Sequence, residues 1–178
     1  MLEYLGKGAD DMNKKLEAAI NEQLNFEIES AHVYLAMQGY VAELGLAGFE
    51  NWLAVQYQEE LAHSQKFMKF ISERNGRINI TGFETPRNEY TSILEVFEVA
   101  LDHEYEVTRR INEIMTLAHA EKDYATISFM QWFIDEQVEE EDNFGTVIDK
   151  IKLVKDAGLY LLDQEMATRV FVDPNAQQ

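Results

Sequence analysis

A short run in the first half of the chain, Glu59-Glu60-Leu61-Ala62-His63, combines two carboxylates with an imidazole. Glu60 and His63 are three residues apart, so on a helix their side chains lie one above the other on the same face. At about 100° per residue, that face also carries Phe49 and Phe67, each within about 20° of Glu60. An ionised carboxylate in a buried apolar stripe is costly unless it is paired or binds a metal ion. The pattern therefore predicts that Glu60 and His63 are metal ligands.

Three further stretches with helical periodicity each carry one glutamate on their apolar line. These are Glu27 within residues 12–40, Glu104 within residues 92–120 and Glu140 within residues 124–154. Each glutamate is near the middle of its stretch, so helices packed side by side bring the carboxylates to one height. Ionised carboxylates cannot share a dry core without cations. An oxygen-rich site with one imidazole suits iron or manganese, with zinc also possible. The sequence thus predicts a dinuclear metal centre that Glu60 is best placed to bridge.

Other polar residues lie close to these candidate ligands on the same helices. Gln137 is one turn before Glu140 and beside it. Glu136 and Glu139 form one patch with Glu140, because the spacing is i, i+3 and i+4. Glu59 is rotated by about 100° from Glu60, toward one flank of the site. The patch is interpreted as a second layer of acids around the metals, with a solvated acidic surface as the alternative for Glu136 and Glu139.

The periodic stretches predict an all-α fold of four long helices, covering residues 12–40, 46–74, 92–120 and 124–154. Residues 75–91 differ from them in glycine, proline and β-branched content, and Asn75-Gly76 is a typical helix stop. Extended at about 3.3 Å per residue, this connector reaches roughly 50 Å. A helix of about 29 residues is about 43 Å long. The connector can therefore cross the whole bundle, which makes the second and third helices parallel.

The whole chain, residues 1–178, is expected to form a single domain. Residues 1–11 are interpreted as an N-terminal arm before the bundle of residues 12–154. Asp156-Ala157-Gly158 breaks the helical pattern, a short fifth helix is expected at residues 159–170, and residues 171–178 form a polar tail.

The composition excludes several classes of function. The chain has 15 basic and 33 acidic residues and a formal charge of −18, so it repels nucleic acid and anionic membranes and attracts cations. A well-solvated surface is the plainer interpretation of the same charge. The absence of cysteine excludes disulfides and iron–sulfur clusters. Without a signal-peptide pattern or a long apolar run, a soluble cytoplasmic protein is expected.

Taken together, these residues resemble the non-haem ferritins of bacteria and archaea. The resemblance covers about residues 12–171 and rests on motifs in all four helices, in the same order and spacing. The motifs are Asn25-Phe26-Glu27, Tyr34, Gln58-Glu59-Glu60-x-x-His63, Glu104 and Asp135-Glu136-Gln137-Val138-Glu139-Glu140-Glu141.

The resemblance implies a role for each motif residue. One iron would lie between Glu27, Glu60 and His63, and a second between Glu60 and Glu104, with Gln137 and Glu140 close by. A third iron would be held by Glu59, Glu136, Glu139 and Glu140. Tyr34 and Trp132 match aromatic residues thought to supply electrons for oxygen reduction, and plain core packing is the alternative for both.

The chain also departs from related families. Bacterioferritin has a second Glu-x-x-His pair, where this chain has Gln137-x-x-Glu140. It also has a haem-ligating methionine where this chain has Leu61, so no haem is expected. A cysteine-free chain cannot form the rubredoxin iron site of rubrerythrins. Animal ferritins line an entry channel with acids at the positions of Ile127 and Met130, so their route for iron entry does not transfer.

The expected function is oxidation of Fe²⁺ by O₂ or H₂O₂ at the dinuclear centre, followed by storage of the ferric mineral. Storage needs a closed homo-oligomer, and the expected number of 24 subunits comes only from the resemblance. The short fifth helix is expected at a symmetry axis. The alternatives are a non-storage di-iron oxidase or peroxidase of the same fold, and a metal-stabilised scaffold without redox chemistry.

Overall fold

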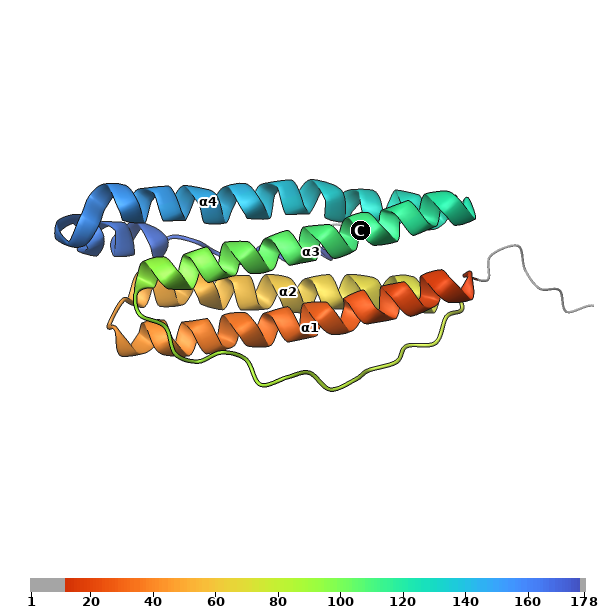
Figure 1. Cartoon of the computed structure of the whole chain (residues 1–178), viewed down its shortest axis with the longest axis horizontal. Coiled ribbons are helices and arrows are strands. Elements are labelled where there is room, and N and C mark those ends of the chain that lie inside the picture. Colours follow the sequence, from red (N-terminus) through yellow and green to blue (C-terminus); the bar gives the residue numbers. More distant parts are fainter. Residues whose placement is uncertain (1–11, 177–178) are drawn as a thin grey trace, which may run out of the picture.

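In the computed structural model, which describes residues 12–176, four long helices lie side by side (Figure 1). They are α1 (Lys14–Glu43), α2 (Ala47–Glu73), α3 (Ile93–Glu121) and α4 (Tyr124–Met166). The predicted all-α bundle is confirmed, and no strand occurs between residues 12 and 176. The N-terminal arm expected at residues 1–11 lies outside this range. None of the helices within it has the length and apolar character that a membrane span requires.

The connector between α2 and α3 runs along the length of the bundle, so α2 and α3 are parallel as expected (Figure 1). Two asparagines of α1 hold the connector in place through both ends of their amides. Asn21 donates to the Arg77 carbonyl at 3.0 Å and accepts from the Asn79 amide at 2.7 Å. Asn25 likewise donates to the Asn79 carbonyl at 2.8 Å. An extended segment has no backbone partners of its own, and these side chains supply them.

The helix ends are fixed by side-chain caps. Ser92 accepts from the Glu95 amide at 3.1 Å at the start of α3. Asp123 caps α4 by accepting from the Thr126 amide at 2.9 Å. The same carboxylate receives two 2.9 Å hydrogen bonds from Arg74, which joins the end of α2 to the start of α4.

The break near the C-terminus differs from the prediction in position. The backbone leaves the helical conformation at Lys155 (φ 50°, ψ −165°), just before the expected Asp156-Ala157-Gly158. Beyond this kink a short helix continues to Met166 instead of Val170. Its Asp163 accepts from the amides of Gly48 and Phe49 at 2.8 and 3.0 Å and so caps α2. The position of the break is compatible with the contact between Asp163 and the start of α2. The contact joins residues far apart in the chain, so a local sequence pattern cannot reveal it.

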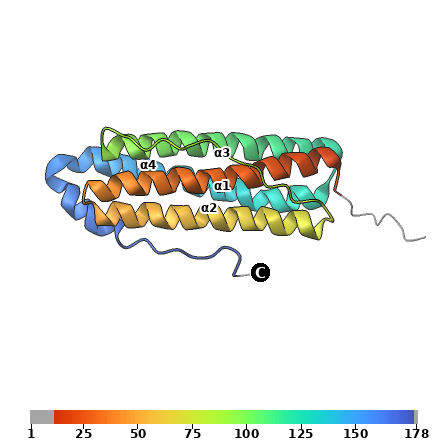
Figure 2. The ribbon, with the colours of Figure 1, turned by 90° about the horizontal axis from the view of Figure 1, so that it is seen from below.

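Residues 167–176, called the C-terminal segment below, return along α2 (Figure 2). The sequence predicted the end of the fifth helix up to Val170 and only a polar tail beyond it. Asn51 of α2 donates to the Arg169 carbonyl at 3.0 Å, and Asn175 donates to the Ala62 carbonyl at 3.0 Å. The segment is therefore placed by defined contacts with α2.

The apolar core is divided into two clusters along the bundle axis. One contains Tyr34, Phe49, Trp52, Phe97 and Phe144. The other contains Leu16, Leu24, Phe67, Ile111 and Phe133. On every helix, the predicted glutamate comes between residues of the two clusters. The fold thus encloses a polar layer at mid-height between two apolar ones.

Candidate metal centre

Each of the four helices places one glutamate in the buried polar layer. Glu27, Glu60, Glu104 and Glu140 are each at most 3% exposed. Helical periodicity puts each carboxylate on the face that packs against the other helices. The structure therefore brings together the four glutamates that the sequence singled out, in an environment where charge is expensive.

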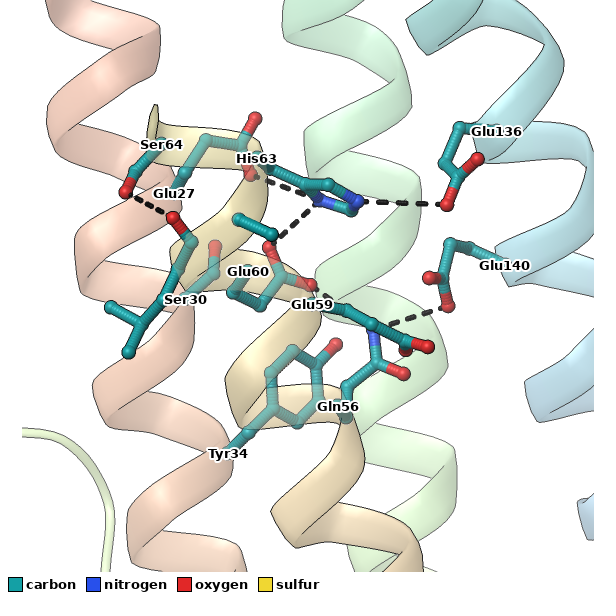
Figure 3. A network of polar contacts seen from close by, with 12 residues as sticks. Glu27, Ser30, Tyr34, Gln56, Glu59, Glu60, His63, Ser64, Glu136 and Glu140 are labelled. Atoms are coloured by element: carbon teal, nitrogen blue, oxygen red, sulfur yellow. Dashed lines mark hydrogen bonds and ion pairs between the residues drawn. The ribbon is translucent and has the colours of Figure 1, made fainter. Parts of the chain in front are cut away.

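Glu27, Glu60 and His63 form the first group able to hold a metal ion. Each offers one ligand atom, and these atoms lie within 4.8 Å of one another. His63 Nδ1 is 3.6 Å from Glu60 Oε2 and 4.0 Å from Glu27 Oε2 (Figure 3). Neither of these two carboxylate oxygens has a hydrogen-bond partner among residues 12–176. Buried oxygens without donors, facing one imidazole, fit a cation.

The opposite edge of the same imidazole faces a second group. His63, Glu136 and Glu140 also have ligand atoms within 4.8 Å of one another. His63 Nε2 is 3.5 Å from Glu136 Oε1, but it has no hydrogen-bond partner among the described residues. One ring therefore lies between two acidic groups, with a nitrogen toward each (Figure 3).

Glu104 belongs to neither group but is held beside them. The Tyr34 hydroxyl donates to Glu104 Oε1, and Gln137 Nε2 donates to Glu104 Oε2 at 3.1 Å. Both predicted neighbours of the centre, Tyr34 and Gln137, thus orient one carboxylate. The ring of Trp132 meets the edge of His63, with centroids 5.5 Å apart.

Burial is the largest influence on the pKa values of Glu60, Glu104 and Glu140. It raises the pKa of Glu60 well above its usual value, against the lowering effect of His63. Burial also raises the pKa of Glu104 to about 7 and, with the repulsion of Glu104, that of Glu140 to about 8. Carboxylates crowded in a dry layer retain protons unless a cation replaces them.

Burial and carboxylates have opposite effects on His63. Burial alone lowers the pKa of the imidazole, but Glu136, Glu60 and Glu27 outweigh it and raise the pKa well above its usual value. Burial, with the nearby Glu104 and Glu60, raises the pKa of Tyr34. Tyr34 is therefore a neutral phenol that keeps its proton and donates a hydrogen bond to the Glu104 carboxylate.

Two buried glutamines contact the candidate ligands and were missed in the sequence. Gln23 Nε2 donates to Glu27 Oε1 at 2.8 Å. Gln56 Nε2 donates to both Glu60 Oε1 and Glu140 Oε2, each at 3.1 Å. The signal was present, because each glutamine is four residues before the glutamate on its own helix. These amides leave the second oxygen of Glu27 and of Glu60 directed at His63.

The predicted patch of further acids is only partly assembled. Glu136 joins the second group, whereas Glu139 is on the exposed surface of α4. Glu59 is partly buried, and its carboxylate accepts a 2.5 Å hydrogen bond from Arg169 of the C-terminal segment. Burial raises the pKa of Glu59, and Arg169 opposes this shift. No sequence pattern places Arg169 here, since 110 residues separate the pair.

The family model of the ferritin-like domain matches residues 17–154. The chain belongs to the ferritin family. The bacterial non-heme ferritin of Staphylococcus saprophyticus is 43% identical over 162 residues, which cover 90% of this chain and 97% of the relative. The bacterial non-heme ferritin of Staphylococcus aureus is 41% identical over 162 residues, covering 90% of this chain and 98% of the relative.

Solved ferritin structures match the fold equally well. A closed form of the Archaeoglobus fulgidus ferritin, engineered by site-directed mutagenesis, has a TM-score of 0.89 at 43% identity and covers 91% of this chain and 100% of its own. The open pore ferritin of the same archaeon has a TM-score of 0.88 at 43% identity. The match covers 89% of this chain and 98% of the archaeal chain. The resemblance seen in the sequence is thereby confirmed.

The raised pKa of Glu140 predicts how the metal-free ferritin responds to pH. Because the folded state retains a proton that the unfolded state releases, stability falls as pH rises from about 4.5 to about 8. Glu140→Gln removes the buried charge. We expect this variant to be more stable than the parent at pH 8.5, by on the order of 2 kcal/mol, and little changed at pH 4.5. Calorimetry of chelator-treated protein measures the difference.

A matched control is Glu113→Gln, which removes an exposed carboxylate on α3. Its effect on the melting temperature should be small at both pH values. A gain from Glu140→Gln that is equal at pH 4.5 and pH 8.5 would contradict the assignment.

Proposed function

We propose that this ferritin oxidises Fe²⁺ to Fe³⁺ in the buried layer and stores the ferric product. The observation that carries the proposal is the pair of donor-free oxygens on Glu27 and Glu60, both facing His63 in the dry interior. Such a site lowers its own free energy by taking up a cation. Carboxylates are hard, anionic ligands, so they favour Fe³⁺ over Fe²⁺.

In the proposed dinuclear centre, different glutamates bind the two iron ions. Glu27, Glu60 and His63 hold the first iron, and Glu60 is shared with a second iron at Glu104 and Glu140. Gln56 donates to both Glu60 and Glu140, so it fixes the spacing between these two carboxylates. The two irons are the substrate, and their binding displaces protons that the buried carboxylates otherwise retain.

Tyr34 is the aromatic residue best placed to take part in the reaction. Its hydroxyl donates to Glu104, and its ring is fully buried. In the proposed reaction it gives one electron to partly reduced oxygen and its proton to Glu104. The tyrosyl radical that results takes back an electron from a further Fe²⁺ ion and recovers the proton. Trp132, whose ring lies at the edge of His63, is proposed as a second source of electrons.

A third iron completes the proposed set on the α2–α4 side. Glu136 and Glu140 supply its nearest carboxylates, and Glu59 and Glu139 flank them. This position lies between the buried centre and the exposed Glu139, which suits iron on its way to the mineral. Iron is proposed over manganese and zinc because the chain belongs to the ferritin family.

Storage requires many chains to enclose a volume, so we propose a closed homo-oligomer of 24 subunits in the cytoplasm. The number comes from the family resemblance. Exposed apolar residues on the short C-terminal helix support assembly, since Tyr160 and Leu161 are 69% and 73% exposed in the single chain. A symmetry axis at this helix would bury both.

The proposal is tested by adding Fe²⁺ aerobically to metal-free protein while following the ferric absorbance and the particle mass. We expect fast oxidation, with hundreds of irons retained in a particle of several hundred kilodaltons. Oxidation that stops at two or three irons per chain on a small oligomer would support a di-iron oxidase or peroxidase instead. Oxidation no faster than in buffer would leave a metal-stabilised scaffold.

Glu60→Gln tests the bridging role. The amide keeps the shape but removes the charge shared by both irons, so the initial oxidation rate should fall on the order of 100-fold. The helical circular dichroism should be unchanged. Glu113→Gln, on the exposed face of α3, is the matched control and should oxidise at the parent rate. A Glu60→Gln protein with the parent rate contradicts the proposed centre.

Leu161→Glu tests assembly through the short helix. A carboxylate in a buried interface is costly, so the particle measured by light scattering should become smaller. Oxidation at the bundle centre should persist while retention of iron is lost. Tyr124→Glu alters an exposed residue at the other end of α4 and serves as the comparison. An unchanged particle mass for Leu161→Glu rules out this helix as an interface.

A further inference from the structure

Arg169 of the C-terminal segment lies on the acidic side of the metal centre. One guanidinium nitrogen is 2.5 Å from Glu59 Oε2, and another donates to the Trp52 carbonyl at 3.3 Å. The guanidinium carbon is 3.9 Å from the centroid of the Trp52 ring. The two charged side chains are only 17% and 18% exposed. An ion pair this enclosed is screened less than a surface pair, and the ring fixes the arginine further.

The rest of the segment follows one face of α2. Asn51, Glu59, Ala62 and Lys66 provide its contacts, at positions that share a helix face. Lys66 donates to the Pro174 carbonyl at 3.3 Å, beyond the turn that carries His63. Residues 167–176 therefore run past the α2 turns that supply Glu60 and His63 (Figure 2).

Apart from the packing of Arg169 on the Trp52 ring, these contacts are hydrogen bonds and an ion pair. Val170 and Val172 are 76% and 65% exposed, so they bury little apolar surface on α2. The shortest contact between the segment and α2 is the Arg169–Glu59 pair. Loss of this pair would remove a charge-assisted restraint on the segment at a small cost in apolar burial.

Arg169 also supplies positive charge to the acids around Glu59. Glu59 interacts electrostatically with Glu136 and Glu139, and Glu140 interacts with both Glu59 and Arg169. A metal ion held by these carboxylates draws on the same negative charge, and at Oε2 on the same lone pairs, that the guanidinium already uses. The arginine and a metal ion are therefore competitors for Glu59.

We propose that Arg169 is a positioning residue that sets the affinity of the third metal position. In the metal-free chain its guanidinium is the counter-ion of Glu59. An ion that binds Glu59 together with Glu136 and Glu140 displaces the guanidinium and releases residues 167–176 from α2. The inference rests on the third iron of the proposed function. It adds that residues 167–176 weaken metal binding at that position and leave α2 when the metal binds.

Calorimetric titration of the metal-free assembled protein with Zn²⁺, which has no redox chemistry, measures the third affinity. Arg169→Gln should bind the third Zn²⁺ per chain about tenfold more tightly than the parent, with the first two affinities unchanged. Arg109→Gln is the matched control, because it removes the same charge from exposed ion pairs with Glu106 and Glu113. The double variant Glu59→Gln/Arg169→Gln should lose the gain.

A spin label measures the release of the segment. The chain has no cysteine, so Val172→Cys provides a unique attachment point at an exposed side chain. The nitroxide should be restrained in the metal-free protein and become mobile as the third Zn²⁺ binds. In Val172→Cys/Arg169→Gln it should be mobile from the start.

Two results would overturn the proposal: an unchanged third affinity in Arg169→Gln, or a label whose mobility does not respond to Zn²⁺. Either is distinct from failure of the proposed function, which appears in the parent as absence of the first two Zn²⁺ ions or of Fe²⁺ oxidation. A fold defect in Arg169→Gln is recognised by loss of those first two ions.

Discussion

The cost of burying four carboxylates at one height of the bundle dominates this structure. An isolated ionised carboxylate in a dry core is strongly unfavourable, and neighbouring ones repel each other. Without metal, the chain meets this cost by raising carboxyl pKa values and by donating amide and phenol protons to the acids. Each of these arrangements is a partial substitute for a cation. A metal ion bound among these carboxylates, as proposed, would replace all of these arrangements at once, so the surrounding fold would raise the affinity of the site.

The division of the core follows from the same constraint. Two apolar clusters, one on each side of the glutamates, supply the burial that offsets an unfavourable layer between them. The clusters also exclude water, so electrostatic interactions within the layer are strong. A more polar core would solvate the carboxylates and so lower the affinity expected of them for a metal ion. Stability and metal affinity should therefore be linked, since a substitution such as Glu140→Gln that relieves the buried layer also removes a proposed ligand.

Periodicity alone locates much of this site, because a helix turns residues three, four and seven apart onto one face. Glu27, Glu60, Glu104 and Glu140 are recognisable as charges on apolar faces, and the long connector implies parallel α2 and α3. The amide of Gln56 is harder to assign, since its link to Glu140 joins residues 84 apart. Arg169 is harder still, because no local pattern specifies that the chain returns along α2. The break at Lys155 was also misplaced by local pattern, because it comes one residue before the predicted Asp156-Ala157-Gly158. The helix beyond it is held by a distant contact, that of Asp163 with α2.

The position of His63 between two acidic groups explains why Glu59 matters. A neutral imidazole has one protonated nitrogen and one free lone pair, so it ligates one metal and donates on its other side. If Nδ1 binds iron with Glu27 and Glu60, then Nε2 carries the proton and faces Glu136 at 3.5 Å. The ring then orients Glu136 and supplies no second ligand. A third ion must rely on carboxylates, of which Glu136 and Glu140 lie in the second group and Glu59 is the next one buried. Arg169 holds Glu59 in the metal-free chain, so in the proposed scheme this one side chain would set how readily the third position fills.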